Sequence, residues 1–184
     1  MFDSSKPLNI IYKQTFANYH IPYNEYDSDL YIKESLKKTW DRFKDPEDKK
    51  SFHIFKDYFD SISDSIMLRY TKPYPETRQV LQWLYENNKI LGIVTGEPKR
   101  IVNRLLEKYQ LNTYIKNVVG MEDYKKHKPN PESLLKMVNI LQCDLNKTCY
   151  IGDSKNDMLA AKQANIDCIL IDRTLYNSNN ETIN

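Results

Sequence analysis

The first part of the chain shows a helical period of apolar residues. Apolar side chains recur every three or four positions through residues 6–19, 28–43 and 48–68, which is the spacing of amphipathic helices. Most of the side chains on these faces are aromatic. They are Leu8, Ile11, Tyr12, Phe16 and Tyr19 in the first segment, and Trp40, Phe43, Phe52, Phe55, Tyr58, Phe59, Ile62 and Ile66 in the other two. The pattern predicts an all-helical unit.

Beyond residue 72 the pattern changes to short apolar runs that alternate with helical segments, which is typical of an α/β fold with a parallel sheet. The predicted strands are 89–94, 117–120, 148–151 and 167–171, and the predicted helices are 77–87, 98–109, 131–141 and 156–164. We therefore expect a helical domain over 1–72 and an α/β core over 73–175. The Asn-rich end, 176–184, is expected to be a flexible tail.

A pair of aspartates follows one of the predicted strands. The run 148–151 stops at Gly152, and Asp153 and Asp157 come next, four residues apart. Asp153 therefore lies at the carboxyl end of a strand, where open α/β sheets bind ligands, and its oxygens suit a hard cation such as Mg²⁺. Asp157 falls in the first turn of the next helix, where a negative charge is favourable. The simpler alternative is that this turn only caps the helix.

A threonine and a lysine lie at comparable places. Thr95 and Gly96 follow the strand at 89–94, and a hydroxyl beside the free N–H groups of the helix at 98–109 is a plausible phosphate seat. Alternatively, Thr95 is a simple helix cap. Lys128 opens a Lys-Pro-Asn-Pro segment, whose prolines fix the chain before a helix. Most lysines in such positions are simply solvent-exposed loop residues. However, the motifs of Thr95, Lys128 and the aspartate pair, in this order, form a rare combination.

In this order the motifs resemble the second, third and fourth motifs of the haloacid dehalogenase superfamily, in its phosphoglycolate phosphatase-like subgroup with a helical cap. The resemblance covers roughly residues 3 to 173. It implies a Rossmann-like parallel core with a cap, and a Mg²⁺-dependent phosphatase that acts on a small phosphorylated metabolite through an aspartyl-phosphate. The site residues that the resemblance implies are Thr95 and Lys128 for catalysis, Thr95, Gly96 and Lys128 for phosphate binding, and Asp153 and Asp157 for the metal.

The front of the chain departs from the family pattern, which begins with a strand ending in Asp-x-Asp-x-Thr. In that motif the first aspartate attacks phosphorus and the second is the general acid and base. This sequence has no such motif, and its opening is similar to the stretch that follows it in the family. A second alignment would make Asp3 the nucleophile, but it places Ser5 at the acid position and so lacks the proton donor. A milder departure is Asn165, in place of a common glycine, since asparagine tolerates a left-handed helix end.

In the family, the absent strand lies between the Thr95 strand and the Asp153 strand. Its loss would leave unpaired backbone groups in a parallel sheet that should be buried. Either the native chain is longer, or the two neighbouring strands have closed up, or another segment fills the place. The sequence therefore predicts a phosphatase that is N-terminally truncated or inactive as written, or else a non-catalytic pseudo-phosphatase that binds a phosphorylated ligand or a protein partner. A phosphomutase is a weaker alternative, because it also needs the absent second aspartate.

Composition narrows the possible functions and locations of the protein. The net charge of the 184 residues is only +2, with both signs interspersed, so no nucleic-acid-binding surface is indicated. The sequence contains neither a long apolar run nor a signal peptide, and we expect a cytoplasmic protein that does not bind membranes. Its oligomeric state cannot be inferred. Three cysteines, Cys143, Cys149 and Cys168, lack the spacing of metal ligands and are expected to be small core residues.

Overall fold

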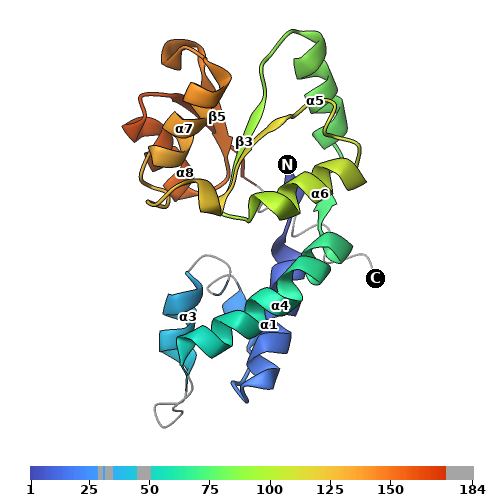
Figure 1. The fold of residues 1–184 in the computed structure, drawn as a ribbon, viewed down its shortest axis with the longest axis vertical. Helices are drawn as coiled ribbons and strands as arrows, with labels where there is room; N and C mark the ends of the chain where they lie inside the picture. The colour runs from blue at the N-terminus through green and yellow to red at the C-terminus, as the bar shows by residue number, and fades with distance from the viewer. Residues whose placement is uncertain (29–30, 32–34, 45–50, 173–184) are drawn as a thin grey trace. The chain divides into compact units, whose positions relative to one another are not determined.

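The computed structural model describes residues 1–28, 31, 35–44 and 51–172, and the chain divides into two compact units, Met1–Leu81 and Gln82–Asn184. The first unit is mainly helical and the second is α/β (Figure 1). The α/β fold class that the sequence predicts is confirmed. Parts of the predicted helices 28–43 and 48–68, and the whole predicted tail 176–184, lie outside the described residues.

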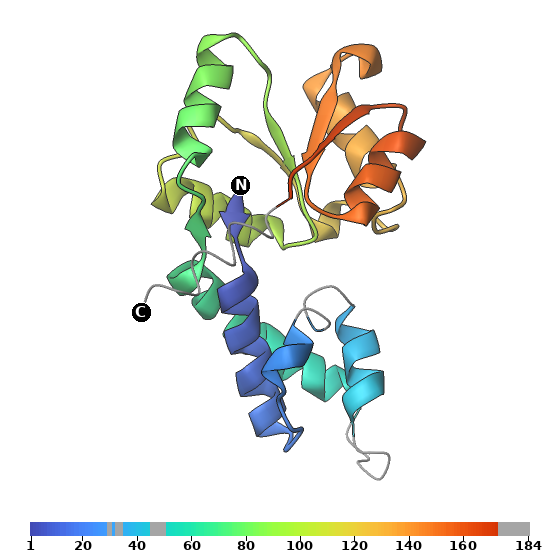
Figure 2. The same ribbon diagram turned by 180° about the vertical axis from the view of Figure 1, so that it is seen from behind.

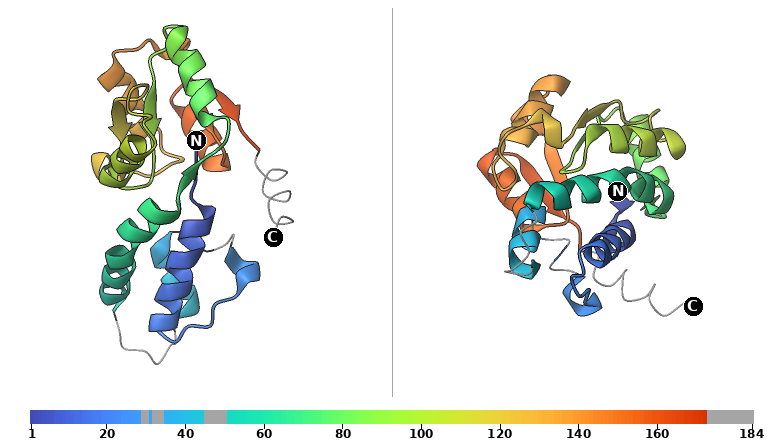
Figure 3. Two further views of the ribbon diagram at one scale, coloured as in Figure 1. Left: turned by 90° about the vertical axis from the view of Figure 1, so that its right-hand side faces the viewer. Right: turned by 60° about the horizontal axis from the view of Figure 1, so that its bottom comes forward.

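Two long helices form the frame of the first unit. Helix α1 (Ser5–Asn18) and helix α4 (Phe52–Tyr70) lie side by side, and α3 (Leu36–Phe43) also packs on α4 (Figures 2 and 3). A short 3-10 turn, η1 (Glu25–Asp27), follows α1. Helix α5 (Thr77–Glu86) crosses from the first unit into the second.

The core of the first unit is aromatic, as the helical period predicts. Its buried residues are Tyr12, Phe16, Tyr19, Ile21, Tyr31, Trp40 and Phe55. The rings meet mostly edge to face or tilted, and the centroids of Trp40 and Phe55 lie 4.7 Å apart. Such pairs add to the stabilisation that comes from burying apolar area. The aromatic side chains therefore hold the unit together as its core.

A two-stranded antiparallel pair, β1 (Phe2–Asp3) with β2 (Lys72–Pro73), joins the two ends of the first unit. Thr77 supports the pair, because its hydroxyl donates to the carbonyl of Met1 at 2.8 Å. The side chain of Asp3 accepts a hydrogen bond from the backbone N–H of Ser5 at 3.0 Å, at the start of α1. Asp3 thus belongs to this antiparallel pair and to neither parallel pair of the second unit.

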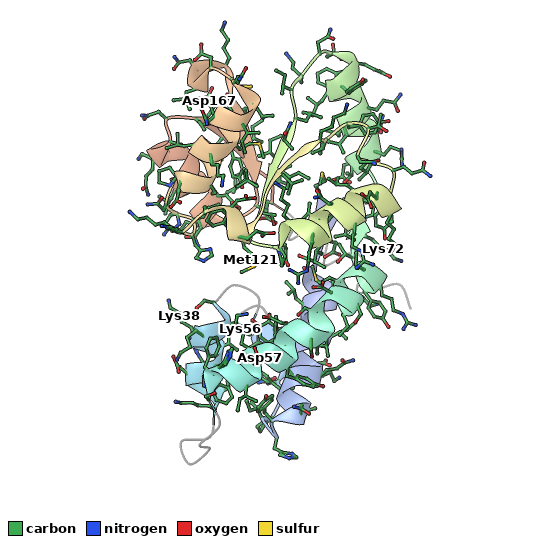
Figure 4. All side chains as sticks on the ribbon, in the orientation of Figure 1. Lys38, Lys56, Asp57, Lys72, Met121 and Asp167 are labelled. Atoms are coloured by element: carbon green, nitrogen blue, oxygen red, sulfur yellow. The ribbon has the colours of Figure 1, made fainter. Side chains whose placement is uncertain are left out.

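Besides the end of α5, the described part of the second unit contains two parallel strand pairs and three helices. Strand β3 (Gly92–Val94) pairs with β4 (Asn117–Val119), and β5 (Cys149–Gly152) pairs with β6 (Asp167–Leu170). The helices are α6 (Lys99–Lys108), α7 (Glu132–Leu141) and α8 (Lys155–Gln163), with short 3-10 turns η2 (Met121–Asp123) and η3 (Leu145–Lys147). Figure 4 shows Asp167, at the start of β6, and Met121, just after β4, at opposite ends of this unit.

The helices of the second unit pack closely on its strands. Helix α7 contacts β3 and β4, and a Cβ built on Gly92 would lie only 2.5 Å from the sulfur of Met137, so a side chain there would require Met137 to shift. Helix α8 covers β5 and β6, with Ala160 and Ala161 fully buried. Helix α8 ends before Asn165, whose φ of 55° is left-handed, as the sequence analysis expects for an asparagine at this helix end.

The other face of the β5–β6 pair is open. Ile151 and Ile169, which are partners in the strand register, are 52% and 54% exposed. Cys149 alternates onto the same face and is exposed, so the expectation of a core cysteine was wrong at this position. Strands β3 and β5 do not pair with each other, and so the structure does not show the expected alternative in which these two strands close up.

Of the helices in the described part of the chain, none combines the length and the apolar character needed to cross a membrane.

Candidate functional site

A largely buried ion pair lies at the centre of the candidate site. The ammonium of Lys128 donates a hydrogen bond to Oδ1 of Asp157, and the two side chains are only 20% and 6% exposed. Lys128 comes from the loop before α7, and Asp157 comes from the first turn of α8. The structure therefore brings together two of the residues that the sequence singles out, although 29 positions separate them.

Tyr150 of β5 joins both members of this pair. Its hydroxyl accepts a hydrogen bond from Lys128 Nζ at 3.0 Å and donates one to Asp157 Oδ1 at 3.1 Å. Burial raises the pKa of Tyr150 to about 12, although the charge of Lys128 opposes the shift, and the hydroxyl is therefore protonated at neutral pH. The sequence reasoning missed this residue.

Both charges of the pair are maintained despite burial. Burial alone would lower the pKa of Lys128, but Tyr150 and Asp157 outweigh that effect and the pKa is raised. Burial alone would raise the pKa of Asp157, but hydrogen bonds from Lys128 and Ser154 outweigh it and the pKa is lowered. Both shifts favour the ionised forms, as expected for a pair with a salt bridge.

The second oxygen of Asp157 caps helix α8. Oδ2 accepts hydrogen bonds from the hydroxyl of Ser154 at 2.7 Å and from the backbone N–H groups of Ser154 and Asp153 at 3.1 and 3.3 Å. The hydroxyl of Ser154 accepts in return from the N–H of Asp157, which completes a capping box. The turn thus caps the helix, and both oxygens of Asp157 are already engaged in hydrogen bonds.

Asp153 differs from Asp157 in its exposure. It directly follows β5, it is exposed, and its carboxylate accepts no hydrogen bond from the described residues. The described ranges contain no group of three or more His, Cys, Asp or Glu side chains that could hold a metal. Oxygen donors of this kind suit Mg²⁺, which proteins commonly bind through one or two carboxylates together with water and substrate phosphates. The exposed carboxylate of Asp153 fits direct contact with such an ion. Both oxygens of Asp157 are engaged in hydrogen bonds, so Asp157 can only support the turn that carries Asp153.

Thr95 lies at the end of β3, where the sequence places it. Its hydroxyl oxygen accepts a hydrogen bond from the N–H of Glu97 at 3.1 Å, which leaves the O–H proton for another acceptor. Its carbonyl accepts from the hydroxyl of Tyr124 at 3.0 Å, and the Tyr124 ring packs edge to face on His127 at 5.4 Å. Tyr124 therefore connects the Thr95 loop to the segment that carries Lys128. Thr95 does not cap α6, since the cap residue is Pro98.

The first N–H of helix α6 is not free to bind phosphate. The N–H of Lys99 donates to both carboxylate oxygens of Glu122, at 3.0 and 3.1 Å. The expectation of free N–H groups behind Thr95 was therefore wrong at the first residue of the helix, because Glu122 reaches it from 23 positions away. Gly96 is exposed in this loop, and a Cβ built there would meet nothing within 4 Å. The carboxyl group of Glu97 lies in the same loop, and burial raises its pKa.

Comparison with known protein families gives one consistent result. A family model described as haloacid dehalogenase-like hydrolase matches residues 1–171. The chain is 29% identical over 101 residues to a phosphoglycolate phosphatase of Pseudomonas fluorescens strain Pf-5, which covers 55% of this chain and 37% of that protein. It is 32% identical over 111 residues to phosphoglycolate phosphatase 1 of Pseudomonas aeruginosa, which covers 60% and 40%. The chain thus spans about two fifths of the length of these curated relatives.

Solved structures share the fold. A haloacid dehalogenase-like family hydrolase from Streptococcus pneumoniae superposes with a TM-score of 0.79 at 16% identity, over 94% of this chain and 80% of that one. A subfamily IA hydrolase of the same superfamily, from Geobacter sulfurreducens, gives a TM-score of 0.75 at 19% identity, over 92% and 83%. At these identities the likeness shows the fold alone.

Proposed function

Because the chain belongs to the haloacid dehalogenase-like hydrolase family, we propose that its second unit carries the phosphate-binding and magnesium-binding residues of a phosphatase for a small phosphorylated metabolite. The observation that carries the proposal is the hydrogen-bonded set of Lys128, Asp157 and Tyr150, next to the exposed carboxylate of Asp153. This arrangement offers a fixed cation for a phosphate oxygen and a free carboxylate for a metal ion.

Each residue has a defined part in this proposal. Lys128 has three N–H donors, of which Tyr150 and Asp157 use two, and the third is left for a phosphate oxygen. The hydroxyl of Thr95 donates to another phosphate oxygen. Asp153 would bind Mg²⁺, which supplies positive charge to the phosphate when it is bound. The second carboxylate, Asp157, keeps Lys128 charged and anchors the loop that presents Asp153.

Replacing Lys128 should strongly weaken the binding of phosphate. The Lys128→Met variant should bind inorganic phosphate about 10- to 100-fold more weakly, because a hydrogen bond to a charged group contributes about 1.5–3 kcal/mol. Isothermal titration in the presence of MgCl₂ measures this change. The matched control is Lys126→Met, since Lys126 lies in the same loop, is exposed and is held through its backbone N–H to Glu132. Equal affinity of the two variants would contradict the assignment of Lys128.

The alternative function is phosphate-ligand binding without turnover. It is favoured by the position of Asp3, whose carboxylate is engaged at the start of α1 and which lies in an antiparallel pair of the first unit. We expect this chain to bind phosphate and to hydrolyse p-nitrophenyl phosphate only at the background rate. Turnover that disappears in the Asp3→Asn variant would overturn that expectation and make Asp3 the nucleophile.

A further inference from the structure

Tyr150 is placed so that its ring is fixed while its hydroxyl reaches the charged pair. The side chains of β5 alternate between two faces, and Tyr150 is on the covered one, packed against the cluster of Leu134, Ala160 and Ala161. Its neighbour Ile151 is on the open face and is 52% exposed. The ring therefore has apolar walls, and only the hydroxyl extends to Lys128.

The contact with Tyr150 restricts Lys128, whose own side chain is flexible. A lysine carries its charge on four rotatable methylene groups, and holding it in one geometry costs side-chain entropy. Here the ammonium is held between the hydroxyl of Tyr150 and Oδ1 of Asp157, and it lies 5.6 Å from the centroid of the Tyr150 ring. Since the hydroxyl also donates to Asp157, the three groups form a closed triangle of hydrogen bonds.

We propose that Tyr150 is a positioning residue, whose hydroxyl holds the Lys128 ammonium against Asp157 so that its remaining N–H is presented to a bound phosphate group. This role rests on the proposed phosphate-binding function. A tyrosine suits it because the packed ring sets the position of the hydroxyl, and because the hydroxyl can accept from Lys128 while it donates to Asp157. Tyr150 itself does not touch the phosphate in this proposal.

The test removes only the hydroxyl, in the Tyr150→Phe variant. The first measurement is the ¹H–¹⁵N signal of the Lys128 ammonium, which is visible when the group is held by hydrogen bonds. We expect this signal in the wild type and its loss or broadening in Tyr150→Phe. The second measurement is the affinity for inorganic phosphate, which should fall about fivefold, the equivalent of one ordinary hydrogen bond. The control is Tyr114→Phe, whose ring packs on Tyr85 at 5.8 Å and which contacts none of the three residues.

Each result of these measurements either supports or overturns the positioning role of Tyr150. Loss of the ammonium signal together with weaker phosphate binding supports the positioning role, provided that Tyr114→Phe shows neither change. A Tyr150→Phe variant that keeps the signal, or that binds phosphate as the wild type does, overturns it. A variant that is less stable but binds phosphate normally shows a structural role only and also overturns it. Failure of the wild type to bind phosphate is a different result, because it contradicts the proposed function before any variant is compared.

Discussion

Replacing Asp157 by alanine should lower the free energy of unfolding by about 3 kcal/mol, the loss expected when one partner of a buried ion pair is removed. The change leaves Lys128, whose side chain is only 20% exposed, without its counter-charge. It also removes the acceptor of three hydrogen bonds from Asp153 and Ser154 at the start of α8. Urea unfolding followed by circular dichroism, in a buffer with a metal chelator, measures the difference.

The control for this variant is Asp153→Ala. Asp153 has the same side chain four positions earlier, but it is exposed and accepts no hydrogen bond from the described residues. Its replacement should therefore change the stability by less than about 0.5 kcal/mol. If the two variants lose the same stability, the hydrogen bonds around Asp157 do not have the importance that we assign to them.

The effect of Asp157 should also depend on pH. The pKa of Asp157 is lowered in the folded protein from the ordinary value of 3.8. A lowered pKa means that the folded state favours the ionised carboxylate, so its stabilisation is fully present above the ordinary value and is lost as the pH falls through the folded pKa. The stability difference between the wild type and Asp157→Ala should therefore be constant near neutral pH and shrink below about pH 4.

Replacing Phe55 by alanine should destabilise the first unit by about 3–5 kcal/mol, the usual cost of truncating a buried aromatic side chain. Phe55 is fully buried in the first turn of α4. Its ring contacts those of Phe16, Tyr19 and Trp40, with centroids 6.4, 5.2 and 4.7 Å away. The cavity would thus open at a point where α1, α3 and α4 meet, and few neighbours could move to fill it.

The adjacent residue provides the control. Ile54 precedes Phe55 in the same helix, and its side chain is 54% exposed. Its backbone carbonyl accepts a hydrogen bond from the hydroxyl of Tyr19. Ile54→Ala keeps that carbonyl, so we expect a change within about 0.5 kcal/mol. Hydrogen exchange of the α1 and α4 amides would show the loss in Phe55→Ala. Similar protection of these amides in both variants would contradict the assignment of the core.

The elements that the sequence predicted correctly are those with a clear period. Helix α1 and its buried residues Ile11, Tyr12 and Phe16 follow from a repeat of three or four positions. Strands β3 and β5 follow from short apolar runs that end at polar residues. The antiparallel pair β1–β2 was missed, because strands of two residues are too short to show any alternation.

The candidate site was predictable in its charged residues but not in its connections. Lys128 and Asp157 stand out because of their motifs, whereas Tyr150 appears in the sequence as one more apolar strand residue. Its hydroxyl partners are 22 and 7 positions away, and only the folded chain brings them together. The same holds for Glu122, which closes the start of α6 from a different loop. Tertiary hydrogen bonds of this kind leave no local pattern in a sequence.

The most direct test of the account is to map phosphate binding on the wild-type chain. Inorganic phosphate is titrated in the presence of MgCl₂, and backbone amide shifts are followed by ¹H–¹⁵N spectroscopy. We predict that the perturbed amides are those of Thr95 to Glu97, Lys128, and Asp153 to Asp157. Shifts confined to other parts of the chain, or no saturable shifts at all, would contradict the proposal that these residues form one phosphate-binding site.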